Sequence, residues 1–323
     1  MMFPLKLVPD NTNIPFLRWR NVAMALSIAL IVGSIVLCFV KGFNLGIDFV
    51  GGQMVRVSFA QPVPIEQLRA RVDALGLGEA TIQQAGTNPR DFSIRTPLPQ
   101  GDDAAVNAAA DKLRNGIAQA YPGAQIGGVE SVSGKVSNEL FQTGAISLGL
   151  AMVAIALYIW FRFEWHFGVG ALFALFHDVA LTLGFFALTQ LEFDLNVVAA
   201  ILTIIGYSLN DTIVVYDRIR ENLRKYRKME IEPLLDLSIN ETLSRTVVTS
   251  LSIGIVLTVL LVLGPDVIFG FTAAMLLGIV IGTFSSVYVS AAILLWLRLK
   301  PDSFVKAEAR PGNAERVEAR ERP

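Results

Sequence analysis

Two polar residues, Asn210 and Asp211, interrupt an apolar segment that runs from 197 to 216. Asp211 lies about fourteen residues into this segment, which is roughly 20 Å along a helix axis at 1.5 Å per residue. Tyr207 and Ser208 share the same part of the segment. Acids inside a membrane span are rare and face a bundle interior or a water-filled cavity. Two interpretations stay open: a hydrogen-bonded structural aspartate, or a carboxyl that takes up and releases a proton.

Arg245 is the candidate counter-charge, because it opens the apolar segment 247–263 directly after a hydrophilic stretch. The start of that segment is polar, with Thr246 and Thr249, which favours a helix end that faces protein or water. Antiparallel neighbouring helices would bring Arg245 toward the half of the membrane that holds Asp211. An arginine that only anchors a helix end at the membrane surface would occupy the same position, so this alternative stays open.

A second pair, His177 and Asp178, lies near the middle of the apolar segment 169–188 and is expected to face inward. The pair is either a member of a proton relay or a buried polar clamp. Neither residue has metal-ligand spacing to another His or Cys, so the sequence predicts no metal and no cofactor.

Glycines surround Asp48 in the stretch "GFNLGIDFVGG". The main interpretation is a tight backbone entry into a following domain, since glycine permits positive φ. Proton entry at Asp48 is the alternative.

The last apolar segment carries a stripe of small residues at every fourth position, which predicts close helix packing in lipid. The stripe comprises Gly270, Ala274, Gly278, Gly282, Ser286 and Ser290. Its partner, in the same bundle or in another subunit, stays open.

The chain has 323 residues, 53% of them hydrophobic, and a mean hydropathy of +0.53. The apolar residues are bunched into stretches long enough to cross a bilayer as helices. Six transmembrane helices are predicted, over residues 22–40, 144–161, 169–188, 197–216, 247–263 and 269–296. The net charge of −1 excludes a generally basic nucleic-acid binder.

The distribution of Lys and Arg predicts the orientation, because cytoplasmic loops carry an excess of both. The loops 189–196 and 264–268 have neither, whereas the other loops are basic. We therefore expect a cytoplasmic N-terminus, a basic cytoplasmic loop and a disordered cytoplasmic tail, at 1–21, 217–246 and 297–323 respectively.

The insert over 41–140 is soluble in character and lies on the outer side in this topology. Alternating stretches such as "QMVRVSFA" and "RDFSIRTP" predict strands, and "PIEQLRARVDAL" and "DDAAVNAAADKLRNGIAQAY" predict helices. The order β-α-β-β-α-β favours an α+β ferredoxin-like domain. It has no Cys, no His and no acid cluster, so catalysis there is not expected.

Four stretches resemble the SecF subunit of the bacterial SecDF protein-export complex, within the resistance-nodulation-division (RND) superfamily. They are "GIDFVGG", "FRFEWHFGVGALFALFHDVALTLGFFALT", "NVVAAILTIIGYSLNDTIVVYDRIREN" and "NETLSRTVVTSL". The resemblance implies half of an RND-type bundle in the bacterial inner membrane, with the large domain periplasmic. It also implies proton-driven translocation of an unfolded polypeptide, with Asp211 and Arg245 in proton transport.

The partners that the resemblance implies are SecD and the SecYEG channel, with YajC or YidC nearby. An RND-type small-molecule efflux subunit is one alternative, although an outer domain of about a hundred residues is small for a drug pocket. A non-titrating scaffold for SecD is another. No nucleophile–base set or phosphate loop supports an enzyme.

Overall fold

The computed structural model describes residues 8–9, 12–85, 88–99 and 103–299. Within these residues, six helical segments are long and apolar enough to cross a membrane, as predicted. Their helices are α1 (Arg20–Val40, preceded by the 3₁₀ turn Phe16–Trp19), α5 (Gly134–Arg162), α6 (Trp165–Thr189), α7 (Leu195–Lys225), α8 (Ile231–Leu263), and α9 (Phe269–Phe284) with α10 (Ser290–Trp296). The predicted disordered tail falls, from residue 300 on, outside the described residues.

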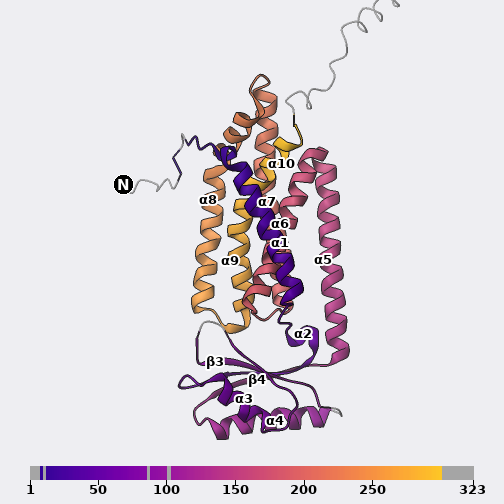
Figure 1. The fold of residues 1–323 in the computed structure, drawn as a ribbon, viewed down its shortest axis with the longest axis vertical. Coiled ribbons are helices and arrows are strands. Elements are labelled where there is room, and N and C mark those ends of the chain that lie inside the picture. The colour runs from indigo at the N-terminus through magenta and orange to yellow at the C-terminus, as the bar shows by residue number, and fades with distance from the viewer. Residues whose placement is uncertain (1–7, 10–11, 86–87, 100–102, 300–323) are drawn as a thin grey trace, which may run out of the picture.

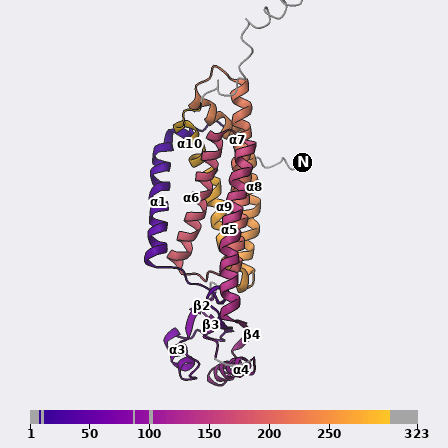
Figure 2. The ribbon, with the colours of Figure 1, turned by 90° about the vertical axis from the view of Figure 1, so that its right-hand side faces the viewer.

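Helices α6 and α7 form the centre of the bundle (Figures 1 and 2). In their most apolar windows 56% and 50% of residues are buried, against 6% for α5 and 11% for α8. The apolar surface of α5 and α8 is therefore left for lipid or a partner. Asp194 begins α7, because its carboxylate accepts the Val197 N–H at 3.0 Å and caps the helix.

The structure differs from the expected loop over 217–246. Both α7 and α8 continue beyond their apolar segments, and only residues 226–230 connect them. The extensions pack as an antiparallel hairpin, with Leu223 buried and Arg218 donating to Glu241 at 2.7 Å. Charged residues outside the membrane thus continue the helices, because the pair buries an apolar stripe of its own.

The outer domain is an antiparallel sheet with two helices on one face. Its sheet order, β2-β3-β1-β4, and its element order confirm the predicted ferredoxin-like fold. The elements are β1 (Gly52–Ser58), α3 (Ile65–Asp73), β2 (Thr81–Gln84), β3 (Asp91–Thr96), α4 (Asp103–Ala120) and β4 (Gln125–Val132).

Helices α3 and α4 cover the sheet face that points away from the membrane helices (Figure 1). The core beneath them includes Val55, Leu68, Ile94 and Leu113, all completely buried. The opposite face of the sheet looks toward the membrane helices and toward the short helix α2 (Ile47–Val50). This arrangement leaves polar strand residues available for contact with the loops of the bundle.

Candidate functional site

The interior of the bundle holds His177 and Asp178 at the middle of α6, both completely buried. His177 Nδ1 lies 2.9 Å from Asp178 Oδ1. The hydroxyls of Ser208, on α7, and Ser285, just after α9, donate to Asp178 Oδ2 at 2.5 and 2.9 Å. Both oxygens of Asp178 thus have hydrogen-bond partners, which come from three helical segments and stabilise a buried carboxyl group.

Asp211 lies about one turn beyond Ser208 on α7 and is 9% exposed. Its Oδ1 accepts a hydrogen bond from the Thr246 hydroxyl, on α8, at 2.6 Å. Its Oδ2 is buried and makes no hydrogen bond among the described residues, although the Ser286 hydroxyl is near enough to stabilise the carboxylate. One oxygen of this carboxyl group is therefore held by a hydrogen bond, while the other makes none.

Arg245 immediately precedes Thr246, and its charge is close enough to act on the Asp211 carboxyl through space. Within the described part of the chain, however, the two side chains form no ion pair within 4.0 Å. The Arg245 side chain is exposed instead. The structure therefore brings the predicted pair into the same region without a direct contact.

Asn210 is also exposed, and its side chain makes no hydrogen bond with any residue that the structure describes. The polar neighbour that does connect helices is Tyr207, whose hydroxyl lies 2.9 Å from that of Ser250 on α8. Ser250 in turn lies 2.9 Å from the Thr283 hydroxyl on α9. The side of α7 that carries Asn210 thus lies outside the hydrogen-bond network around Asp178 and Asp211.

The small-residue stripe packs against α7 of the same chain. A Cβ added at Gly278 would overlap the Ile204 side chain, and one at Gly282 would lie 3.2 Å from Ser208 Cβ. Ala274 and Ser286 are completely buried in the same seam. The partner left open by the sequence is therefore within the bundle, and the glycines let α9 bring its serines close to Asp178.

A π-helical turn, Ser285–Val289, joins α9 to α10. It directs two consecutive serines to different partners: Ser285 donates to Asp178, and the Ser286 hydroxyl lies 3.0 Å from that of Thr212. Single π turns inside helices are common at functional sites. The role of Ser285 was missed from the sequence, because no pattern of residue types signals such a turn.

At the outer end of the bundle, Asp48 Oδ2 accepts the Leu195 N–H at 3.0 Å, at the start of α7. The tight entry into the domain follows, since Gly51 and Gly52 have φ values of 77° and 126°. A Cβ at Gly52 would lie 2.8 Å from the Thr96 carbonyl oxygen, which only glycine avoids. The glycine conformations fit the tight backbone entry expected from the sequence, and Asp48 holds this entry to the start of α7.

The outer joint, residues 42–48 together with 190–195, connects the bundle to the sheet. Asn44 and Gln83, on β2, exchange two side-chain hydrogen bonds at 2.6 and 2.7 Å. Arg95, on β3, donates to the Leu45 carbonyl. The Gly46 N–H donates to the Phe193 carbonyl at 2.9 Å. The loop between α6 and α7 is thereby linked to two strands of the domain.

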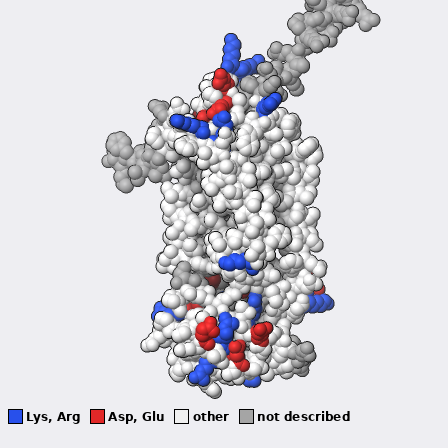
Figure 3. All heavy atoms as spheres, in the orientation of Figure 1, with Lys and Arg blue, Asp and Glu red and all other residues white. Residues whose placement is uncertain are grey.

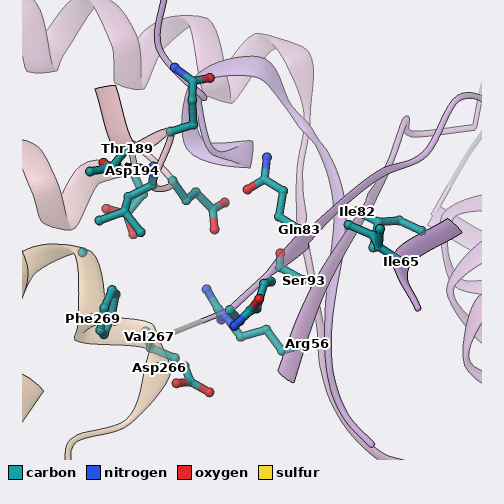
Figure 4. Close-up of a pocket in the computed structure, with 16 residues that line it drawn as sticks. Arg56, Ile65, Ile82, Gln83, Ser93, Thr189, Asp194, Asp266, Val267 and Phe269 are labelled. Atoms are coloured by element: carbon teal, nitrogen blue, oxygen red, sulfur yellow. Dashed lines mark hydrogen bonds between the residues drawn. The ribbon is translucent and has the colours of Figure 1, made fainter. Parts of the chain in front are cut away.

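A cavity of about 340 Å³ lies beside the outer joint, between the sheet and the bundle. Figure 4 shows Arg56 and Gln83 on the domain side and Asp194 and Asp266 on the bundle side. Burial raises the pKa of the carboxyl groups of Glu192 and Asp194, while the positive charge of Arg56 lowers that of Glu192 in part. Burial at the joint therefore favours the protonated forms of Glu192 and Asp194 over their carboxylates.

Among the described residues, no group of three or more His, Cys, Asp or Glu could hold a metal ion. The buried network contains two polar atoms without a hydrogen-bond partner in the described region, Asp211 Oδ2 and His177 Nε2.

Comparison with known proteins identifies the family. Residues 113–300 match the family model described as protein export membrane protein SecD/SecF, C-terminal. A protein translocase subunit SecF from Rhodobacter capsulatus is 43% identical over 314 residues, which cover 93% of each chain. The SecF of Vibrio alginolyticus is 40% identical over 311 residues, 96% of this chain and 98% of that one. The chain belongs to the SecF family.

A second model, the SecD/SecF GG motif, matches residues 36–63, which contain Asp48 and the glycines of the domain entry. The SecF-family chain also resembles the crystal structure of SecDF from Thermus thermophilus, with a TM-score of 0.82 and 35% identity. That match covers 91% of this chain and 40% of the SecDF chain. Another SecDF crystal structure, in a super-membrane-facing form, matches with a TM-score of 0.63.

Proposed function

We propose that the chain is a multi-pass inner-membrane subunit of the protein-export machinery, which acts with SecD to move unfolded polypeptides outward. Proton-motive force drives this step through Asp211. Membership of the SecF family supports the export function. The observation that carries the proton coupling is Asp211 itself, a buried carboxyl in a membrane span with one oxygen held and the other free.

The proposed cycle has two states of the α7–α8 contact. With Asp211 ionised, Arg245 is drawn toward it beside the Thr246 hydrogen bond. Protonation at the free oxygen removes this attraction, and the two helices repack. Moving one charge across the membrane supplies about 2.3 kcal/mol per 100 mV, which is enough to bias two packings that are close in free energy.

The outer joint is the proposed link between this change and the domain. It ties the loop that begins α7 to β2 and β3 through Asn44, Gln83 and Arg95. A shift of α7 along or around its axis therefore reaches the sheet through hydrogen bonds at one place. The domain is proposed to pull or hold the emerging chain in this way.

The proposed orientation puts both termini in the cytoplasm and the domain in the periplasm. In Figure 3, Lys and Arg gather near the two ends of the molecule, and a broad belt of uncharged surface separates them. The α7–α8 hairpin and its connection carry a dense basic group, including Arg224, Lys225, Arg227 and Lys228. This excess supports a cytoplasmic hairpin.

SecD is the proposed direct partner, with SecYEG as the channel and YajC or YidC as further neighbours. Asn210 and Arg245 are polar residues on membrane helices, yet they are exposed in the isolated chain. Polar groups are costly in contact with lipid tails, which supports a protein partner over this face. The match covers 40% of the Thermus SecDF chain, so that chain contains a further part that could correspond to the partner.

The test is Asp211→Asn in the complex reconstituted with SecD, with proton flux and polypeptide export both measured. Asn keeps the size and the Thr246 contact but cannot titrate, so we expect intact assembly and loss of proton-driven export. Asp217→Asn, on the same helix beyond the membrane, is the matched control and should keep both activities. Normal export by the Asp211 variant would instead support a non-titrating scaffold.

A further inference from the structure

A charged notch lies where the C-terminal end of α5 meets the C-terminal end of α7, near the α7–α8 hairpin and far from the outer domain. It has a volume of about 600 Å³ and is lined by charged side chains alone: Arg162, Asp217, Arg220, Glu221, Arg224 and Lys225. Four of these are cations and two are anions. Arg162 donates one hydrogen bond to Asp217 at 3.4 Å, and the lining as a whole keeps two more cations than anions.

An aromatic ring supports two of the arginines. Phe163 is buried, and the guanidinium groups of Arg162 and Arg220 lie 5.0 and 5.4 Å from its ring centroid. Cation–π contacts of this length hold a guanidinium in place without using its hydrogen-bond donors. The two planar donor groups are thus arranged beside one another at the notch before any ligand binds.

Their donors are not fully used. Arg220 lies 3.6 Å from Glu164 and 3.7 Å from Asp217, too far for hydrogen bonds, although its side chain is only 18% exposed. Its Nε is buried and has no partner among the described residues. Arg224 forms no ion pair within the described part of the chain. A half-buried guanidinium with spare donors favours an oxyanion as a further partner.

Exposed aromatic residues beside the notch indicate that it lies near the depth of the lipid headgroups. Trp160, Phe161 and Trp165 are next to it in the chain and are 69%, 86% and 52% exposed, and such aromatic residues mark the membrane surface. Arg220 is nine residues beyond Asp211, roughly 14 Å further along α7. The exposed, apolar surface of α5 continues from the aromatic residues into the membrane.

We propose that this notch binds the phosphate of an anionic phospholipid. The headgroup phosphate accepts hydrogen bonds from Arg162 and Arg220, with Arg224 and Lys225 adding charge. The acyl chains lie along α5 over Trp160. Basic pockets between membrane helices on the cytoplasmic side are suited to anionic lipid headgroups, whose negative charge this lining complements. The site is separate from Asp211 and independent of the export mechanism.

Native mass spectrometry of the purified full chain tests the proposal, with phosphatidylglycerol and phosphatidylcholine as probes. We expect phosphatidylglycerol to bind more tightly to the unaltered chain. Arg162→Gln combined with Arg224→Gln should weaken that binding by roughly 25-fold, or about fivefold for each charge removed. The charge-preserving pair Arg162→Lys and Arg224→Lys should restore most of it.

The matched control is Arg227→Gln combined with Lys228→Gln, since both residues are exposed on the same hairpin but do not line the notch. This control should bind phosphatidylglycerol normally. Equal losses in the two Gln pairs, equal binding of phosphatidylcholine, or inorganic phosphate that competes as tightly as the lipid would each overturn the proposal. Circular dichroism of every variant identifies any loss of fold.

Discussion

Two carboxyl groups lie in the interior of the same bundle, and they differ in how they are held. Asp178 has hydrogen bonds at both oxygens, from His177, Ser208 and Ser285. Asp211 has one, from Thr246, and its second oxygen is buried without a partner in the described residues. The two groups are on neighbouring helices, α6 and α7, and the difference lies in the hydrogen-bond donors around each carboxyl.

This difference separates a structural role from a switching role. Any change at the Asp178 carboxyl would disturb hydrogen bonds that join three helical segments, whereas Asp211 has an oxygen that makes no hydrogen bond. A buried polar network is stable when complete and costly when broken. We therefore infer that Asp178 holds the packing against which Asp211 changes its charge.

The largest effect is expected when the complete network is broken. Asp178→Ala leaves His177 and two serines without their partner, so the free energy of unfolding should fall by about 3 kcal/mol or more. Asp211→Ala removes one hydrogen bond and should cost about 1 kcal/mol. Unfolding in mixed detergent micelles measures both. Equal losses for the two variants would remove the distinction drawn between them.

An intermediate effect is expected at the α7–α9 seam, which holds Ser208 and Ser285 in register. At Gly278 an added methyl group overlaps Ile204, so Gly278→Ala should destabilise by about 1–3 kcal/mol. Gly254, on α8, has no atom within 4 Å of such a methyl group, so Gly254→Ala should stabilise slightly through helix propensity. The same unfolding assay compares the two variants. A stabilising effect of Gly278→Ala would contradict close packing between α7 and α9.

The smallest effect is expected at the outer joint, whose acids contrast with both bundle carboxyls because they are near water. Burial raises the pKa of Glu192 and Asp194 in the folded joint, so folding favours their protonated forms. The joint should be most stable at pH values below the ordinary carboxyl range and should weaken as the pH rises through the raised pKa values. Glu192→Gln should flatten this dependence.

Hydrogen exchange at residues 42–48, corrected for the intrinsic rate at each pH, measures the opening of the joint. Asp73→Asn, at the end of α3 and away from the joint, is the control and should leave the pH dependence unchanged. An unchanged dependence in Glu192→Gln would show that other groups control the joint.

Much of the architecture follows from periodicity in the sequence. Long apolar runs predict the six spans, and the alternating stretches of the insert predict its strands, because each pattern depends on residues close together in the chain. The polar character of the sites is visible in the same way: Asp211 and His177 stand out against their apolar neighbours. Their partners are harder to predict.

Partners that are far apart in the chain depend on packing. Asn44 and Gln83 are polar residues of ordinary types, and only the fold brings them together. Ser285 reaches Asp178 because a π turn changes the helix register at that point. Arg245 was the candidate counter-charge of Asp211, with a surface anchor as the open alternative, and it lies exposed on a face for which we propose a second protein. Sequence periodicity contains no information on these contacts.

A single residue, the N-cap Ser133, lies between strand β4 and helix α5, so no flexible linker separates the helix from the sheet. The helix has 29 residues, which gives a rod of roughly 44 Å, and little of its surface is buried against the bundle. A tilt of about 5° at the sheet would swing the opposite end by roughly 4 Å over that length. A rotation of the domain would therefore displace the far end of α5, at the opposite surface of the membrane.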